Sequence, residues 1–228
     1  MSHTLVIGGS QGLGRHIAEH FTKEGGRVTL TSRDASKAEK VAAEIGGAVT
    51  GLAVDLSRPE SIEQALAPVK TVDHLVITAI EQAANSLQSF SVEDALRATT
   101  AKVVGYLEAV HTLTPRFAPG ASIVLFGGLA KERPYPGSTV VTAVNGAVSA
   151  LVRTLAVELA PIRVNALHPS LVGDSPQWRD RPQPPQVTRT PIGRPVTMAE
   201  VTDATVFLLR NTGVNAVDLY LDGGLMVS

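Results

Sequence analysis

The chain has 228 residues, of which 44% are hydrophobic and 18% charged, with a formal net charge of -1 and no cysteine. The length suits one α/β domain with a full core. The charge balance gives no basic excess for nucleic acid or an anionic membrane, and the lack of cysteine excludes disulfides, thiol catalysis and thiolate metal sites. We expect a cytoplasmic protein with a small-molecule partner, since strand one begins at once and no apolar run approaches the roughly eighteen residues of a membrane span.

The first predicted elements are a short apolar strand at 5–7, a glycine-rich turn and a helix at 15–23. Gly8, Gly9, Gly12 and Gly14 form the turn. Such a turn lets backbone N–H groups approach a pyrophosphate and directs the positive end of a helix at it. Ordinary strand-to-helix turns also contain glycine clusters, so the rest of the chain must decide between a pyrophosphate-binding turn and an ordinary one.

Strand and helix patterns then alternate along the chain. Further strands are predicted at 27–31, 49–54, 73–77, 121–126, 162–167 and 216–221, and further helices at 35–45, 57–69, 91–113, 139–160 and 198–210. This alternation with short connections predicts a doubly wound, seven-stranded parallel sheet with helices on both faces. We therefore expect a single-domain Rossmann fold over 1–228.

The second strand ends where dinucleotide folds hold the adenosine ribose. An acidic residue at this place binds the ribose hydroxyls of NAD, whereas an arginine accommodates the extra phosphate of NADP. Ser32 and Arg33 stand here, which favours NADP(H). The alternative is a solvated surface arginine.

A proline-rich segment at 170–195 breaks the alternation. Its prolines, among them those at 176, 182, 184, 185 and 191, exclude a regular helix or a central strand. Long irregular segments in compact domains are often functional loops, so we interpret it as a substrate lid with Trp178 as its apolar contact. The alternative is a surface loop.

Two long helices are predicted, at 91–113 and 139–160. Small residues in the second, such as Ala143, Gly146 and Ala147, suggest close packing against either the chain's own sheet or another subunit. We expect a homodimer or a homotetramer through these helices. No metal site is predicted, because the six histidines include no HExxH pattern.

At this point the sequence resembles the short-chain dehydrogenase/reductase family along nearly its whole length. The landmarks are the Gly8, Gly12, Gly14 spacing, the Asp55-Leu56 pair, the run at 159–169 and the LDGG sequence at 221–224. The resemblance implies an NADP(H) cofactor. The implied cofactor-binding residues are Gly8, Ser10, Gln11, Gly12, Leu13, Gly14, Ser32, Arg33, Asp55, Leu56, Thr78, Ala79, Asn145, Pro169, Val172 and Asp174, with Asp174 either holding the carboxamide or capping the next turn.

The sequence departs from the family at the catalytic positions. Family members usually carry Asn, Ser, Tyr and Lys, whereas this chain has Lys102, Gly128, Val141 and Asn145 at the corresponding places. The family's Tyr protonates the alkoxide, its Lys holds the ribose and lowers the Tyr pKa, and its Ser polarises the carbonyl. Asn145 retains only the ability to hydrogen-bond a ribose hydroxyl.

Several residues are candidates for the missing roles. Tyr135 is a candidate displaced acid, and Arg133 a candidate for stabilising negative charge. Glu81 and Lys102 are further catalytic candidates, with solvated loop or helix charges as the alternative. Gly128, Val141, His168 and Trp178 are the expected substrate contacts.

Three functions follow from this pattern. A protonated imine accepts hydride without an acid in the same step, so reduction of a cyclic C=N bond fits the missing tetrad and is our first expectation. Carbonyl reduction with a displaced acid such as Tyr135 is the second. The third is an NADP(H)-binding pseudoenzyme with a regulatory or cyclase-type role.

Overall fold

The computed structural model describes residues 1–80, 85–182 and 190–228 and is organised around one seven-stranded sheet with the order β3-β2-β1-β4-β5-β6-β7. Every strand pairs in parallel with its neighbour. The predicted doubly wound Rossmann fold is therefore confirmed. The strands are β1 (His3–Ile7), β2 (Arg27–Ser32), β3 (Val49–Ala53), β4 (Val72–Ile77), β5 (Phe117–Phe126), β6 (Arg163–Pro169) and β7 (Asp218–Leu221).

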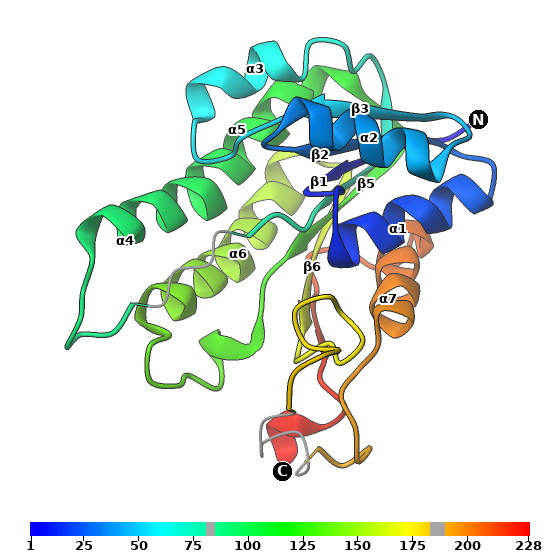
Figure 1. Ribbon diagram of the computed structural model, residues 1–228. Coiled ribbons are helices and arrows are strands. Elements are labelled where there is room, and N and C mark those ends of the chain that lie inside the picture. Colours follow the sequence, from blue (N-terminus) through cyan, green and yellow to red (C-terminus); the bar gives the residue numbers. More distant parts are fainter. Residues whose placement is uncertain (81–84, 183–189) are drawn as a thin grey trace.

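Helices cover both faces of the sheet, as Figure 1 shows. Successive strand residues point to opposite faces, so Leu5 and Ile7 enter one core cluster and Val6 enters the other. The first cluster is closed by α3 (Ile62–Ala65), α5 (Gly105–Leu113) and α6 (Thr139–Glu158), and the second by α1 (Gly12–Lys23), α2 (Ala35–Ile45) and α7 (Met198–Arg210).

The helix predicted at 57–69 is wrong in length. The structure has only a 3₁₀ turn at Pro59–Ser61 followed by the four residues of α3. Pro68 explains the early end, because proline cannot donate the helical hydrogen bond and disfavours helical geometry in the preceding residue.

The helix predicted at 91–113 forms but is interrupted. It consists of α4 (Val92–Thr99), a π-helical turn at Thr100–Val104, and α5. The Ser91 side chain caps α4 by accepting a hydrogen bond from the Asp94 backbone N–H at 3.2 Å. Gly105 allows close packing on the sheet edge, since a Cβ there would lie 2.2 Å from the Leu56 carbonyl oxygen.

Helix α6 is long and apolar enough to cross a membrane by length and composition, with a window of mean hydropathy 1.6. The helix is not an unbroken apolar run, since Thr142, Asn145 and Arg153 interrupt it. Its apolar character has a local explanation: Val144, Val148, Val152 and Leu155 are buried, and the helix packs against β5 and β6. It belongs to one helix layer of the sheet (Figure 1).

The segment predicted as a lid follows β6 and lies beyond the C-terminal end of that strand (Figure 1). Its described residues, 170–182 and 190–195, form turns and bends. A single parallel bridge between Val172 and Val196 joins its two ends. This geometry places the segment beside the edge of the sheet where the glycine loop also lies.

Candidate functional site

A cleft of about 890 Å³ runs along the C-terminal ends of the strands. The glycine loop and the ends of β2 to β6 form its floor, and residues 170–172 and 175–178 form one wall. Trp178 lies in this wall. The predicted cofactor residues that line the cleft are Gly8, Ser10, Gln11, Gly12, Leu13, Gly14, Ser32, Arg33, Asp55, Leu56, Thr78, Ala79, Pro169 and Val172.

The glycine loop needs glycine for close backbone approach. A Cβ on Gly14 would lie 2.2 Å from the Gly8 carbonyl oxygen, and one on Gly8 would lie 2.7 Å from the Ala79 nitrogen. Gly8 and Gly12 also have φ angles of +89° and +53°, which side-chain-bearing residues adopt rarely. Because helix α1 begins at Gly12 with its N-terminus at the cleft, the loop fits a pyrophosphate.

Polar groups gather at the adenosine end of the cleft. Ser32, Arg33, Lys37 and Asp55 line it together with Asp34. The Asp34 carboxylate caps α2, accepting from the Ser36 hydroxyl at 2.7 Å and from the Lys37 N–H at 3.1 Å. These hydrogen bonds lower the pKa of Asp34.

Lys37 is a functional candidate that the sequence analysis missed. Its ammonium lies 2.9 Å from the Gln11 side-chain oxygen, which brings a second cation next to the glycine loop. Its position four residues after Arg33, in the first turn of the predicted helix, is the signal that could have found it.

Asp55 is also held by local hydrogen bonds. Its Oδ1 accepts from the Ser57 N–H at 3.0 Å and from the Ser57 hydroxyl at 2.7 Å.

Asp174 contacts the N-terminus of α7 rather than the turn that follows it. Its Oδ1 accepts a hydrogen bond from the Met198 N–H at 2.8 Å, at the N-terminus of α7. The side chain is exposed and is not among the cleft residues. A carboxylate at a helix N-terminus is stabilised by the unsatisfied N–H groups there, which accounts for its orientation.

Gly127 and Gly128, at the end of β5, have their side-chain space filled by other residues. A Cβ on Gly127 would lie 2.2 Å from His168 Nδ1, and one on Gly128 would lie 2.9 Å from Asn145 Nδ2. Asn145 is 5% exposed and, like Gly128, is not among the cleft residues. The Asn145 side chain therefore fills the space that a serine side chain at position 128 would need.

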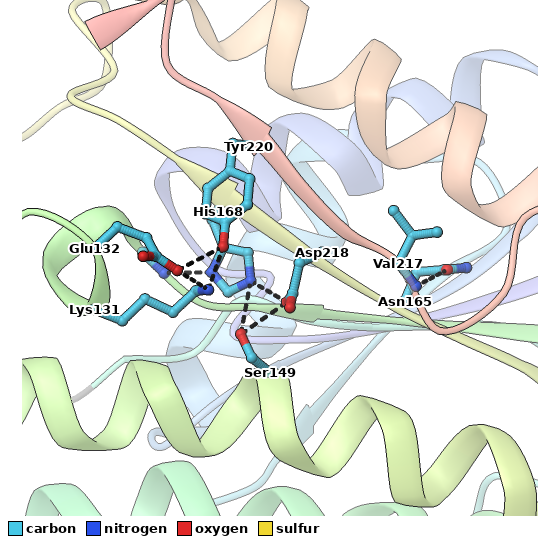
Figure 2. Close-up of polar contacts among 9 residues, drawn as sticks. Lys131, Glu132, Ser149, Asn165, His168, Val217, Asp218 and Tyr220 are labelled. Atoms are coloured by element: carbon cyan, nitrogen blue, oxygen red, sulfur yellow. Dashed lines mark hydrogen bonds and ion pairs between the residues drawn. The ribbon is translucent and has the colours of Figure 1, made fainter. Parts of the chain in front are cut away.

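His168 is buried below this turn and does not reach the cleft, which corrects its prediction as a substrate contact. Figure 2 shows its hydrogen bonds. Its Nδ1 accepts from the Gly128 N–H at 3.1 Å, so Nε2 carries the proton that is donated to Asp218 Oδ1 at 2.7 Å. Ser149 also donates to Asp218 Oδ1, at 2.8 Å. The imidazole thus fixes the backbone at the family's serine position.

The charges in this network match a neutral imidazole. Burial lowers the pKa of His168, and the neighbouring cations Lys131 and Lys102 contribute to the lowering. Burial alone would raise the pKa of Asp218, but the hydrogen bonds from His168 and Ser149 outweigh it and lower the pKa. The site therefore holds His168 neutral and Asp218 ionised.

Lys131, Glu132 and Tyr220 form a second cluster that the sequence analysis did not identify (Figure 2). The Lys131 ammonium donates to the Tyr220 hydroxyl and, at 2.9 Å, to Glu132 Oε1. The Tyr220 ring stacks on His168 with 5.3 Å between ring centroids. Asp218 and Tyr220 are polar residues two apart in an otherwise apolar strand, and this alternation is the signal for a polar sheet face.

The remaining predicted catalytic and substrate residues do not converge on the cleft. Tyr135 is 58% exposed, which argues against its role as an enclosed acid. Arg133 donates to the Leu225 carbonyl oxygen and so connects its loop to the C-terminal segment. Val141 is partly buried on α6 and is not a lining residue. Glu81 lies outside the described residues.

Lys102 is buried within the π-helical turn. The residue is 5% exposed, and its ammonium lies 5.7 Å from the centre of the Tyr106 ring. No hydrogen bond or ion pair joins this ammonium to any residue that the structure describes. Burial lowers the pKa of Lys102 to about 8.

Comparisons with known proteins find relatives that match nearly the whole chain. A family model described as enoyl-(acyl carrier protein) reductase matches residues 8–226. L-xylulose reductase of Bos taurus is 32% identical over 98% of this chain and 96% of its own length. Carbonyl reductase family member 4 of Danio rerio is 30% identical over 98% and 97%. The solved 3-ketoacyl-(acyl-carrier-protein) reductase from Brucella melitensis, complexed with NADH, is 29% identical with a TM-score of 0.88, covering 99% of this chain and 98% of that one.

Proposed function

This chain belongs to the short-chain dehydrogenase/reductase family, and we propose that it is an oxidoreductase that reduces a carbonyl compound with NADPH. The observation that carries the proposal is the cleft at the C-terminal strand ends, which extends from Arg33 and Lys37 at one end to Gly127 and Trp178. When bound there, the nicotinamide supplies a hydride to the substrate carbon. The relatives named for reduction of xylulose, carbonyl and 3-oxoacyl compounds support a ketone substrate.

The preference for NADPH rests on the adenosine end. Asp34 is the carboxylate nearest to Arg33 in sequence, and its Oδ1 is engaged in capping α2. Ser32, Arg33 and Lys37 then provide a hydroxyl and two cations for a 2′-phosphate. A solved relative is named with NADH, so the preference for NADPH requires its own measurement.

The carbonyl substrate is favoured over the cyclic imine by the charges near the reacting end. Among the described residues that line the cleft, the carboxylates are Asp34 and Asp55, and both lie at the adenosine end. An iminium cation would therefore lack a carboxylate partner in this lining.

Self-association through the two long helices is part of the same proposal. Val92 and Leu96 on α4 are 62% and 63% exposed, and Val104 in the π-helical turn is 48% exposed. Exposed apolar side chains grouped on one element favour burial against another surface. A second copy of this chain, packed along α4, α5 and α6, is the partner that we propose.

NADPH oxidation with a panel of ketones and matched cyclic imines tests the function. Polyol ketones and 3-oxoacyl thioesters represent the ketone classes named for the relatives. We expect turnover of at least one ketone class. Turnover of imines alone would replace carbonyl reduction with C=N reduction, and NADPH binding without oxidation by any acceptor would establish a cofactor-binding protein instead.

A further inference from the structure

The order of the strands divides the cleft into two ends. Arg33 and Lys37 lie at the adenosine end, and β2 and β3 stand on one side of β1 in the sheet. The strands β4, β5 and β6 follow on the other side of β1. A dinucleotide whose pyrophosphate lies on the glycine loop would therefore have its nicotinamide past the ends of β4 to β6. This reacting end is where a substrate carbonyl must be bound.

The lining of the reacting end is mainly apolar. Ala79, Ile80, Phe126, Leu171 and Trp178 are among its lining residues. Binding sites of this kind orient a ligand by a small number of polar groups on apolar walls. A hydroxyl that is free to donate a hydrogen bond at this end would therefore decide where the carbonyl oxygen of a ketone lies.

Ser170 carries such a hydroxyl. The hydroxyl-bearing residues that line this end, in the part of the chain that the structure describes, are Thr78, Ser170 and Ser175. The Thr78 hydroxyl donates to the Gly8 carbonyl oxygen at 3.2 Å, and the Ser175 hydroxyl donates to the Val172 carbonyl oxygen at 2.7 Å. Each of these groups has a single proton, which is already in use. The Ser170 hydroxyl has no hydrogen-bond partner among the described residues.

Backbone hydrogen bonds hold Ser170 at the strand ends. Its N–H donates to the Leu221 carbonyl oxygen at 2.9 Å, which continues the pairing of Pro169 with Leu221 between β6 and β7. On the other side of β6, the Gly127 N–H donates to the Leu167 carbonyl oxygen at 2.9 Å, and Gly127 also lines the cleft. The sheet therefore fixes the place of Ser170, as a positioned donor requires.

Gln177 is the other uncharged polar residue to compare with Ser170 at this end. It lines the cleft and its side chain carries an N–H donor. Gln177 is exposed, however, whereas Ser170 is half-buried. Water competes for the hydrogen bonds of an exposed amide, so a donor that is partly shielded stabilises charge on a ligand more effectively.

We propose that the Ser170 hydroxyl binds the carbonyl oxygen of the substrate and stabilises the negative charge that develops there. As hydride adds to the carbonyl carbon, the electron pair of the C=O bond moves to the oxygen. The oxygen keeps the hydrogen bond from Ser170 and takes a proton from solvent water, so the product is an alcohol. The inference rests on the proposed carbonyl reduction.

Three variants test the proposal by kinetics. Ser170→Ala removes the hydroxyl, and Ser170→Thr retains it. Ser2→Ala is the matched control, since Ser2 is exposed beside the N-terminal end of β1. The probes are L-xylulose and the 3-oxobutanoyl thioester of N-acetylcysteamine. We expect Ser170→Ala to lower kcat by about a hundredfold for the ketone that wild type reduces, with NADPH affinity unchanged. Ser170→Thr should keep most of the wild-type rate, and the control all of it.

Two further measurements use the complex with NADP+, in which no reduction takes place. Trp178 is the single tryptophan of the chain and lines the cleft, so its fluorescence reports ketone binding. Ser170→Ala should weaken this binding by about twofold to tenfold, the effect of one hydrogen bond. The infrared C=O stretch of the bound ketone, isotope-labelled at its carbonyl, should move to higher frequency in Ser170→Ala, because a hydrogen bond to the oxygen weakens the C=O bond.

The possible outcomes separate the two proposals. Wild-type protein that binds a ketone without reducing it contradicts carbonyl reduction, and a C=O stretch that moves in Ser170→Ala then still supports the Ser170 contact. Wild-type protein that neither binds nor reduces either ketone contradicts both. Turnover that survives in Ser170→Ala, or a C=O stretch that is the same in this variant and in wild type, overturns the role of Ser170 alone. A change of the C=O stretch in Gln177→Leu but not in Ser170→Ala assigns the contact to Gln177 and also overturns it.

Discussion

His168 Nε2 lies 2.7 Å from Asp218 Oδ1, and this contact joins β6 to β7 directly below the turn at Gly128. Asp218→Ala should lower the free energy of unfolding by about 1–3 kcal/mol, because His168 and Ser149 would lose their common acceptor in the interior. Urea denaturation measures the change. Asp218→Asn keeps an acceptor oxygen and should lose less, so equal losses in the two variants would contradict this account.

Stability should fall on acidification below about pH 6.5. Burial lowers the pKa values of His3, His74 and His168 in the folded protein, so the unfolded chain binds protons more readily in this range. The stabilisation is present above the unfolded histidine pKa and is lost as the pH falls from there through each folded pKa. Each histidine contributes a slope of up to about 1.4 kcal/mol per pH unit.

Asp218 adds a second loss of folding stability at lower pH. Its folded pKa is lowered, so its stabilising contribution is present above the unfolded carboxyl pKa and is lost as the pH falls through the folded value. Urea midpoints measured between pH 8 and pH 3 report both the loss due to the histidines and the loss due to Asp218. A stability that stays constant from pH 7.5 to pH 5 would contradict the assignment of neutral buried histidines.

Gly127→Ala should destabilise the protein strongly. The new Cβ would lie 2.2 Å from His168 Nδ1, and overpacking of this kind costs about 1–3 kcal/mol or more. Gly128→Ser should cost less, because the nearest atom is the end of the Asn145 side chain. Thermal unfolding compares the two variants, and the reverse order of their melting temperatures would be evidence against this packing.

Arg33→Glu should reduce the affinity for NADPH by about tenfold to a hundredfold, the effect of losing a charge-assisted hydrogen bond to a phosphate. The affinity for NADH, which lacks that phosphate, should change little. Fluorescence titration of both cofactors measures this selectivity. Lys23→Glu makes the same charge change at an exposed site on α1 and serves as the control. A parallel loss for both cofactors would exclude a phosphate contact.

Leu96→Glu should shift the protein toward the monomer. Leu96 is 63% exposed on α4, and a carboxylate at this place would be buried without a partner in the proposed interface. Light scattering after size-exclusion chromatography gives the mass. Val227→Glu changes an apolar residue near the C-terminus that is 87% exposed and serves as a comparison. Wild-type protein that is already monomeric would rule out the interface.

The sequence by itself determined the architecture, because the alternation of apolar strands and amphipathic helices is local information. It also located the glycine loop and most of the cleft lining, since the residues that follow parallel strands meet at one edge of the sheet. The helix at 57–69 failed because Pro68 outweighed the helical pattern around it.

Only the tertiary structure decided how the side chains at the reacting end are used. Tyr135 and Arg133 are close to this end in sequence, yet one is exposed and the other binds the C-terminal segment. The burial of Lys102 and the contact of His168 with Asp218 depend on elements that are far apart in the chain. Residue type indicates which chemistry is available, whereas packing determines the exposure, partner and protonation state of each group.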